Sequence, residues 1–138
     1  MPFNPQFYCH KFKKAGLHYE VGIGIFNGLI VWAHGPFKCG TFADVAIFRS
    51  SLKQKLLQGE VVLTDGGYPD GKCVRTIPNT STKFSKDVRA RHEAVNGRLK
   101  SFKVLKHVFR HSMHKHRLCF MAVAQVIQIE LMIYGALF

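Results

Sequence analysis

The stretch Glu60-Val61-Val62-Leu63-Thr64-Asp65-Gly66-Gly67 (residues 60–67) places an acidic residue directly after an apolar run and before two glycines. A short apolar run that ends in a turn is typical of a buried β-strand. In open α/β sheets, ligand sites lie beyond the carboxyl ends of the strands. Asp65 is therefore a candidate metal ligand. Taken alone, Asp65 fits better a turn residue that only caps the strand.

The residues before this strand predict a hairpin followed by a helix. Alternating apolar and polar residues favour a strand over 19–26, Asn27-Gly28 favours a hairpin turn, and residues 29–33 favour a second strand that ends at Gly35-Pro36. Apolar residues at intervals of three and four then predict a helix over residues 43–57, ended by Gly59.

The residues after this strand predict one more strand and two long helices. Residues 73–77 form the short strand, a helix runs from Ser85 to about Lys103, and an apolar helix over residues 118–138 closes the chain. This order indicates an α/β fold, and 138 residues are enough for one compact domain.

The helix that begins at Ser85 is expected to have two distinct faces. At about 100° per residue, one narrow stripe is polar and a separate stripe is apolar. The polar stripe comprises Arg89, Glu93, Asn96 and Lys100, and the apolar one comprises Val88, Val95, Leu99 and Phe102. Taken alone, the polar stripe fits an ion-pair ladder that stabilises the helix. Beside Asp65, it also fits a metal-binding carboxylate flanked by phosphate-binding cations.

Three blocks, in order, resemble the DDE endonuclease domain of Harbinger-type transposases. They are Gly35-Pro36-Phe37-x-x-Gly40-Thr41-x-x-Asp44, Thr64-Asp65-Gly66-Gly67-Tyr68, and Arg89-x3-Glu93-x6-Lys100. The stretch from Glu93 to Phe102 is especially similar to that family. The resemblance extends over almost the whole chain.

The resemblance implies an RNase H-like mixed sheet flanked by helices, and a nuclease that acts on DNA phosphodiesters. Asp65 matches the second catalytic carboxylate and Glu93 the third, and both would bind Mg²⁺ or Mn²⁺, which prefer oxygen ligands. Asp44 would be a supporting carboxylate, or simply an N-terminal helix charge. Arg89 and Lys100 would contact phosphate oxygens.

The chain departs from the family pattern at its first residues. The family's first aspartate precedes a segment like Pro2-Phe3, but here Met1 stands at that point, and the first acidic residue is Glu20 on a different predicted strand. We therefore expect residues 1–138 to be a single partial domain without its first, central strand and inactive alone. The alternative is a non-catalytic fragment that binds DNA or a protein.

The charge of the chain favours a polyanionic partner. It carries 20 Lys and Arg against 8 Asp and Glu, a net charge of +12. DNA is the expected partner, while an anionic membrane surface and a ribosomal context are the alternatives. A homo-oligomer or a separate DNA-binding protein would also fit the family resemblance.

The remaining features point to an intracellular protein, nuclear or cytoplasmic. The first residues do not resemble a signal peptide, and the four cysteines are far apart and read as free thiols. The apolar C-terminal stretch is long enough to span a bilayer, but Gln125, Gln128 and Glu130 favour a helix buried against a sheet. His107 and His111 would share a helical face, which permits zinc, although a solvated basic segment is the simpler interpretation.

Overall fold

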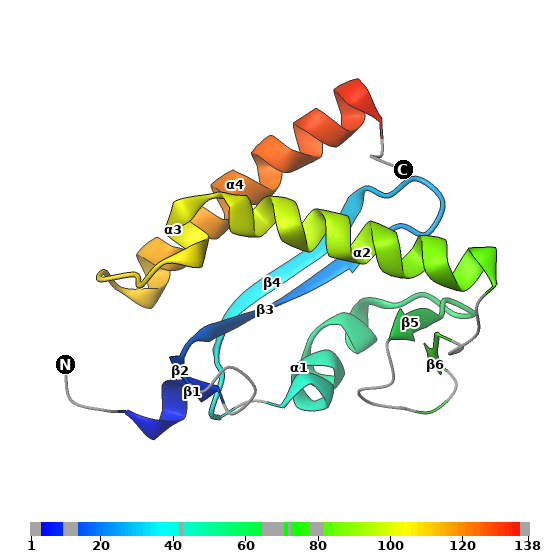
Figure 1. Ribbon diagram of the computed structural model, residues 1–138. Helices are drawn as coiled ribbons and strands as arrows, with labels where there is room; N and C mark the ends of the chain where they lie inside the picture. Colours follow the sequence, from blue (N-terminus) through cyan, green and yellow to red (C-terminus); the bar gives the residue numbers. More distant parts are fainter. Residues whose placement is uncertain are drawn as a thin grey trace. The chain divides into compact units, whose positions relative to one another are not determined.

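The computed structural model describes residues 4–9, 14–41, 43–64, 71, 73–77 and 82–135 (Figure 1). These residues form a mixed α/β structure, as the sequence predicts, in which the strands pair as three two-stranded sheets. The chain divides into two compact units. The first comprises Met1–Glu20 and His34–Pro78, and the second comprises Val21–Ala33 and Asn79–Phe138.

The first unit begins with a small antiparallel sheet. The 3-10 helix η1 (Pro5–Phe7) follows Asn4, whose side-chain oxygen accepts a hydrogen bond from the amide of Gln6 at 3.0 Å. Strand β1 (Tyr8–Cys9) then pairs with β2 (Lys14–Ala15), with Cys9 opposite Lys14. This pair was not expected from the sequence, because two-residue strands leave no readable periodicity.

The predicted hairpin is confirmed. Strand β3 (Leu17–Ile23) pairs with β4 (Ile30–Lys38), and the amide of Gly24 donates to the carbonyl of Leu29 at 2.9 Å across the turn. The Asn27 side chain accepts from the amide of Leu29 at 3.0 Å, and Gly28 has a φ of 68°, which favours glycine. The turn therefore forms where Asn27-Gly28 predicts it.

The expectation that Gly35-Pro36 ends the second strand is wrong, because β4 continues through this pair to Lys38. Gly35 has a φ of 148°, and a side chain there would lie 2.7 Å from the ring of Tyr19. Glycine thus lets β4 pass close to β3. Pro36 has no backbone N–H to donate to a neighbouring strand. A strand of a two-stranded sheet tolerates this, because such a strand is an edge strand.

The predicted helix over residues 43–57 is interrupted at Ser51. Helix α1 (Asp44–Ser50) ends there, and a 3-10 turn η2 (Leu52–Lys55) follows. The Ser51 hydroxyl donates to the carboxylate of Glu20 at 2.8 Å and is also within hydrogen-bonding distance of the carbonyl of Ile47. These side-chain bonds compete with the helical ladder, so the apolar spacing overstates the helix length.

The strands predicted before and after the Gly66-Gly67 pair both form. Strand β5 (Val62–Thr64) pairs in parallel with β6 (Val74–Thr76), with Thr64 opposite Thr76. The core of the first unit contains the fully buried Phe48 and further buried apolar residues: Cys9, Ile47, Val74 and Ile77.

The second unit contains three helices and the turn end of the hairpin. Helix α2 (Lys83–Ser101) begins two residues earlier than predicted, because the Thr82 hydroxyl accepts a hydrogen bond from the amide of Ser85. Phe102, in an extended conformation, separates α2 from the short α3 (Lys103–Lys106). Helix α4 (Met113–Tyr134) begins earlier than the apolar stretch, with Ser112 as its N-cap.

Helix α4 is buried along one face only. Phe120, Val123, Ile127 and Leu131 are at most 7% exposed, but Leu118, Ile129 and Met132 on the other face are 54–67% exposed. By length and composition α4 could cross a membrane, and it is the one such helix among the described residues. The prediction of a buried helix is therefore confirmed for one side of α4 only. Next to that side, the Gln128 side chain forms hydrogen bonds with the backbone of Ile30 in β4.

Candidate nucleic-acid interface and metal centre

Helix α2 presents a polar stripe beside its buried face. Val95 and Leu99 are 1% and 5% exposed and fix the inward side of the helix. Glu93 and Lys100 are exposed, while Arg89 and Asn96 are half-buried at the edge of the stripe. The Asn96 amide lies 3.2 Å from Nδ1 of His92, one turn earlier. The apolar stripe predicted from the sequence is thus buried at Val95 and Leu99 and half-buried at Val88 and Phe102.

Lys86 belongs to the same stripe, and sequence reasoning did not single it out. It is exposed, and it lies three residues before Arg89 and seven before Glu93, so all three share one side of α2. The helical spacing that grouped the other members would have identified it. Glu93 therefore lies between cations at both ends of the stripe, with Lys86 and Arg89 on one side and Lys100 on the other.

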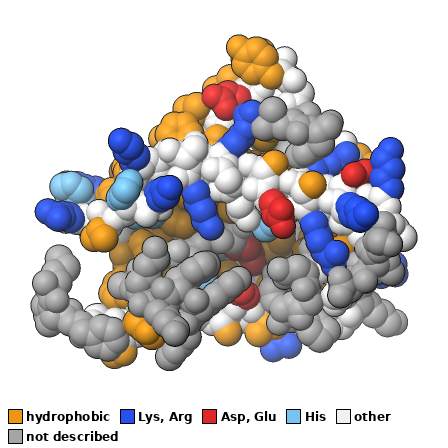
Figure 2. Space-filling model, in the orientation of Figure 1, with side chains coloured by type: hydrophobic (Ala, Val, Ile, Leu, Met, Phe, Trp, Pro, Cys, Tyr) orange, Lys and Arg blue, Asp and Glu red, His pale blue; other side chains and the backbone are white. Residues whose placement is uncertain are grey.

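The surroundings of this stripe are strongly basic. Between Thr82 and Gly135 the chain contains 11 Lys and Arg but only 3 Asp and Glu. Figure 2 shows the Lys and Arg side chains spread along α2 and α3, with few acidic groups among them. Such a surface attracts a polyanion and holds it through many weak contacts.

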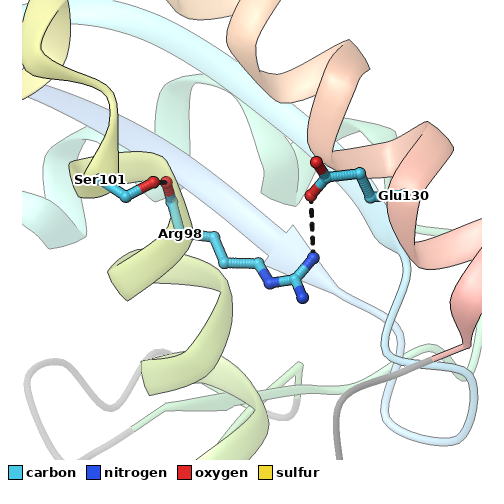
Figure 3. A network of polar contacts seen from close by, with 3 residues as sticks. All are labelled: Arg98, Ser101 and Glu130. Carbon is cyan, nitrogen blue, oxygen red and sulfur yellow. Dashed lines mark hydrogen bonds and ion pairs between the residues drawn. The ribbon is translucent and has the colours of Figure 1, made fainter.

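One acid and one cation of the second unit neutralise each other away from this stripe. Arg98 Nη1 donates to Glu130 Oε2 at 3.0 Å and so connects α2 with α4 (Figure 3). The Ser101 hydroxyl donates to the carbonyl of Arg98 at 2.7 Å. Arg98 is therefore a structural cation that joins α2 to α4, and the positive charge of the stripe comes from Lys86, Arg89 and Lys100.

Asp65 lies outside the described residues, so its distance from Glu93 stays a prediction. The residue before it is described: Thr64 ends β5 and is 8% exposed. Its hydroxyl is buried without a hydrogen-bond partner among the described residues. A buried hydroxyl that is left unpaired is costly. The end of β5 thus has an unused hydrogen-bonding group beside the position that the sequence assigns to a metal ligand.

Asp44 begins α1, where its carboxylate faces the positive end of the helix dipole. The carboxylate is 67% exposed and lies 3.9 Å from Nδ1 of His18. The expected position at a helix N-terminus is therefore what the structure shows. A role in supporting the metal ion stays a prediction.

Close backbone contacts explain the two glycines of the block that precedes Asp44, Gly35 and Gly40. A side chain at Gly40 would collide with the carbonyl oxygens of Pro5 and Gln6, and the Gly40 amide donates to that of Gln6 at 2.8 Å. Gly35 passes close to Tyr19 in the same way. This block thus anchors the end of β4 and the start of α1 against the N-terminal residues.

Among the described residues, no three His, Cys, Asp or Glu side chains form a group that could hold a metal ion. His107 and His111 do not share a helical face, because residues 107–112 lie between α3 and α4 in irregular backbone. Instead, the rings of His111 and His116 both pack edge-on against Phe109, at 5.4 and 4.8 Å between centroids. The zinc alternative therefore loses its geometric basis.

Glu20 has a role that sequence reasoning did not find. Its carboxylate accepts the Ser51 hydroxyl and helps to end α1. A long-range bond of this kind, over 31 residues, leaves no signal in local periodicity.

Searches against protein-family models, curated proteins and solved structures give no match for this chain.

Proposed function

We propose that this chain is a DNA-binding domain of the DDE nuclease type, in which α2 presents Glu93 and its flanking cations to a phosphodiester backbone. The single observation that carries the proposal is the exposed position of Glu93 on α2, between Arg89 and Lys100. An acid among the cations of this stripe weakens polyanion binding, unless a metal ion neutralises it. A metal-ligating role explains why the acid is there.

The metal ion would be Mg²⁺ or Mn²⁺, held by the carboxylates of Asp65 and Glu93. Both ions prefer oxygen ligands, and a pair of such ions can activate a water and stabilise the leaving oxygen of a phosphodiester. The order of hairpin, α1, parallel β5–β6 pair and α2 supports an RNase H-like arrangement. In such a fold the end of β5 carries one carboxylate and α2 the other.

The residues of this chain match two of the three carboxylates that the chemistry requires. Two carboxylates bind a metal ion more weakly than three and leave a two-ion site incomplete. We therefore expect the purified 138-residue chain to bind DNA and to show no Mg²⁺- or Mn²⁺-dependent cleavage of plasmid DNA. Non-catalytic DNA binding is the second candidate function, favoured by the 11 Lys and Arg against 3 Asp and Glu between Thr82 and Gly135.

The proposed interface is tested by DNA binding at several salt concentrations. Fluorescence anisotropy with a labelled duplex of arbitrary sequence should give log K falling linearly with log salt. Lys100→Gln should reduce the slope by about one unit, since each phosphate contact releases about one counterion. The matched control is Lys55→Gln, which removes an exposed lysine of η2 in the first unit and should leave the slope unchanged. Equal slopes for the two variants would contradict the interface.

The role of Glu93 is tested by removing its charge without changing its size. In the absence of divalent ions, Glu93→Gln should bind DNA more tightly than the wild-type protein, because the carboxylate repels phosphates. The difference should disappear when millimolar Mg²⁺ is added. Asp87→Asn is the control, since Asp87 is exposed on a different side of α2. An identical gain for both variants would show a general charge effect only.

A further inference from the structure

Helix α4 has a second apolar face opposite its buried side. Figure 2 shows hydrophobic side chains on the surface of the molecule where α4 runs in Figure 1. Its exposed members follow one another at intervals of four, three, four and three residues: Leu118, Ala122, Gln125, Ile129 and Met132. This is the spacing of a coiled-coil seam, in which every core position but one is apolar. Val126 and Ile133 flank the seam and are 46% and 65% exposed.

From this spacing we infer that the exposed face of α4 binds the same face of a second copy of this chain, with the two helices antiparallel. The two-fold axis would pass near Gln125, the single polar residue of the seam. Leu118 would then lie opposite Met132 of the second copy, and Ala122 opposite Ile129 of the second copy. A small residue opposite a large one lets the two helices approach closely.

The charges of α4 favour a second copy and the antiparallel orientation. Two chains of net charge +12 repel each other, but α4 contains no Lys or Arg after Arg117. Its one acid, Glu130, is already paired with Arg98. Lys115 and Arg117 lie at the N-terminal end of α4. The antiparallel arrangement brings these cations close to the C-terminal carbonyls of the other helix, where the helix dipole stabilises positive charge.

The area of the face reaches what a specific interface needs. The large side chains of the face and its flanks are between 46% and 67% exposed, and each offers roughly 80 Å² of removable apolar area. Val31 of β4, 65% exposed, lines a groove with Gln125 and extends the face. Two copies would together bury about 1,000 Å², the lower limit expected for a specific interface. A weak dimer is therefore the expected state.

The test measures self-association by sedimentation equilibrium. Its variants introduce opposite charges at two apolar positions of the proposed seam. The wild-type protein should form a dimer, more strongly at high salt because salt screens the repulsion between the basic chains. Leu118→Glu and Met132→Lys should each weaken the dimer by more than about tenfold, because each places an unpaired charge in the seam. Leu57→Glu, at a 72% exposed leucine of the first unit, should leave the dimer unchanged.

The double variant Leu118→Glu with Met132→Lys decides the orientation. In the antiparallel dimer each new carboxylate faces a new ammonium group of the second copy, so association should recover. The two positions are 14 residues apart in one helix, about 21 Å, and cannot pair within one chain.

Three outcomes would overturn the inference. A monomeric wild-type protein at high micromolar concentration excludes the dimer. A dimer that the double variant does not restore excludes the antiparallel arrangement. Binding of the wild-type protein to neutral phosphatidylcholine vesicles, lost in Leu118→Glu, would assign the face to a lipid surface instead. Circular dichroism confirms that each variant keeps its helices.

Discussion

Gln128 of α4 forms two hydrogen bonds with the backbone of one residue, Ile30 of β4. The Ile30 amide donates to Gln128 Oε1 at 2.9 Å, and Gln128 Nε2 donates to the Ile30 carbonyl at 3.2 Å. The side chain thus pairs with the first residue of β4 much as a neighbouring strand would. It joins a helix to a strand 98 residues earlier in the chain.

Gln128→Glu should destabilise the protein by about 1–3 kcal/mol, because a carboxylate cannot donate to the Ile30 carbonyl and repels it. The free energy of unfolding, measured by urea denaturation at pH 7.5, tests this. Gln58→Glu provides the control, since Gln58 is exposed in a turn of the first unit. If both variants unfolded at the same urea concentration, the two hydrogen bonds between Gln128 and Ile30 would not stabilise the protein.

His116 should make the protein less stable in mild acid. His116 is 9% exposed and its ring packs against Phe109, and burial lowers the pKa of its imidazole. The folded state therefore favours the neutral ring, while the unfolded state takes up a proton near pH 6.5. The stabilisation is complete above that pH and is lost as the pH falls through the lowered pKa.

The measurement compares urea midpoints at pH 7.5 and pH 5.0 for three proteins. His116→Gln should lose less stability between these two values than the wild-type protein does. His114→Gln, which changes an exposed histidine two residues away, should behave as the wild-type protein. If the wild-type protein and His116→Gln lost equal stability, the buried ring would not be the cause.

Cys39 should react slowly with alkylating agents although it is only half-buried. Burial, and then the neighbouring Cys9 and Asp44, raise the pKa of the Cys39 thiol to about 12. The thiolate is the reactive form, so little of it is present in the native protein at pH 8.5. Because the unfolded thiol ionises near pH 8.5, this group also makes the fold less stable as the pH rises from there towards 12.

Mass spectrometry after timed treatment with iodoacetamide measures the rate at Cys39. Native Cys39 should react more than about tenfold more slowly than the same residue in urea-unfolded protein. Asp44→Asn should increase the native rate, since it removes one of the negative charges that raise the pKa. Equal rates in native and unfolded protein would contradict this account of Cys39.

Local sequence patterns predicted the elements whose determinants are short-range. Asn27-Gly28 placed the hairpin turn, and the 3.6-residue period separated the two faces of α2. The failures came from contacts over long sequence distances. The Glu20 carboxylate helps to end α1 at Ser51, and the close approach of Gly35 to Tyr19 lets β4 continue.

The sequence likewise predicted the part of the candidate site that lies within one helix, and not the part that depends on contacts between elements. Helical spacing placed Glu93 and Lys100 on an exposed stripe of α2, and it would have included Lys86 had it been applied one turn earlier. The apolar composition of α4 predicted a buried helix, but composition cannot separate a buried face from an exposed one. Convergence of Asp65 with Glu93 depends on tertiary structure, which periodicity within one element does not encode.

The central claim is that Asp65 and Glu93 together hold a divalent ion, and Mn²⁺ binding tests it most directly. Electron paramagnetic resonance measures free Mn²⁺, whose signal falls as the ion binds to protein. We predict one weak site in the wild-type chain, and a loss of affinity of more than about tenfold in both Asp65→Asn and Glu93→Gln, since each removes a carboxylate ligand. Asp87→Asn should bind as the wild-type protein does. Unchanged Mn²⁺ affinity in Glu93→Gln or Asp65→Asn would contradict the claim.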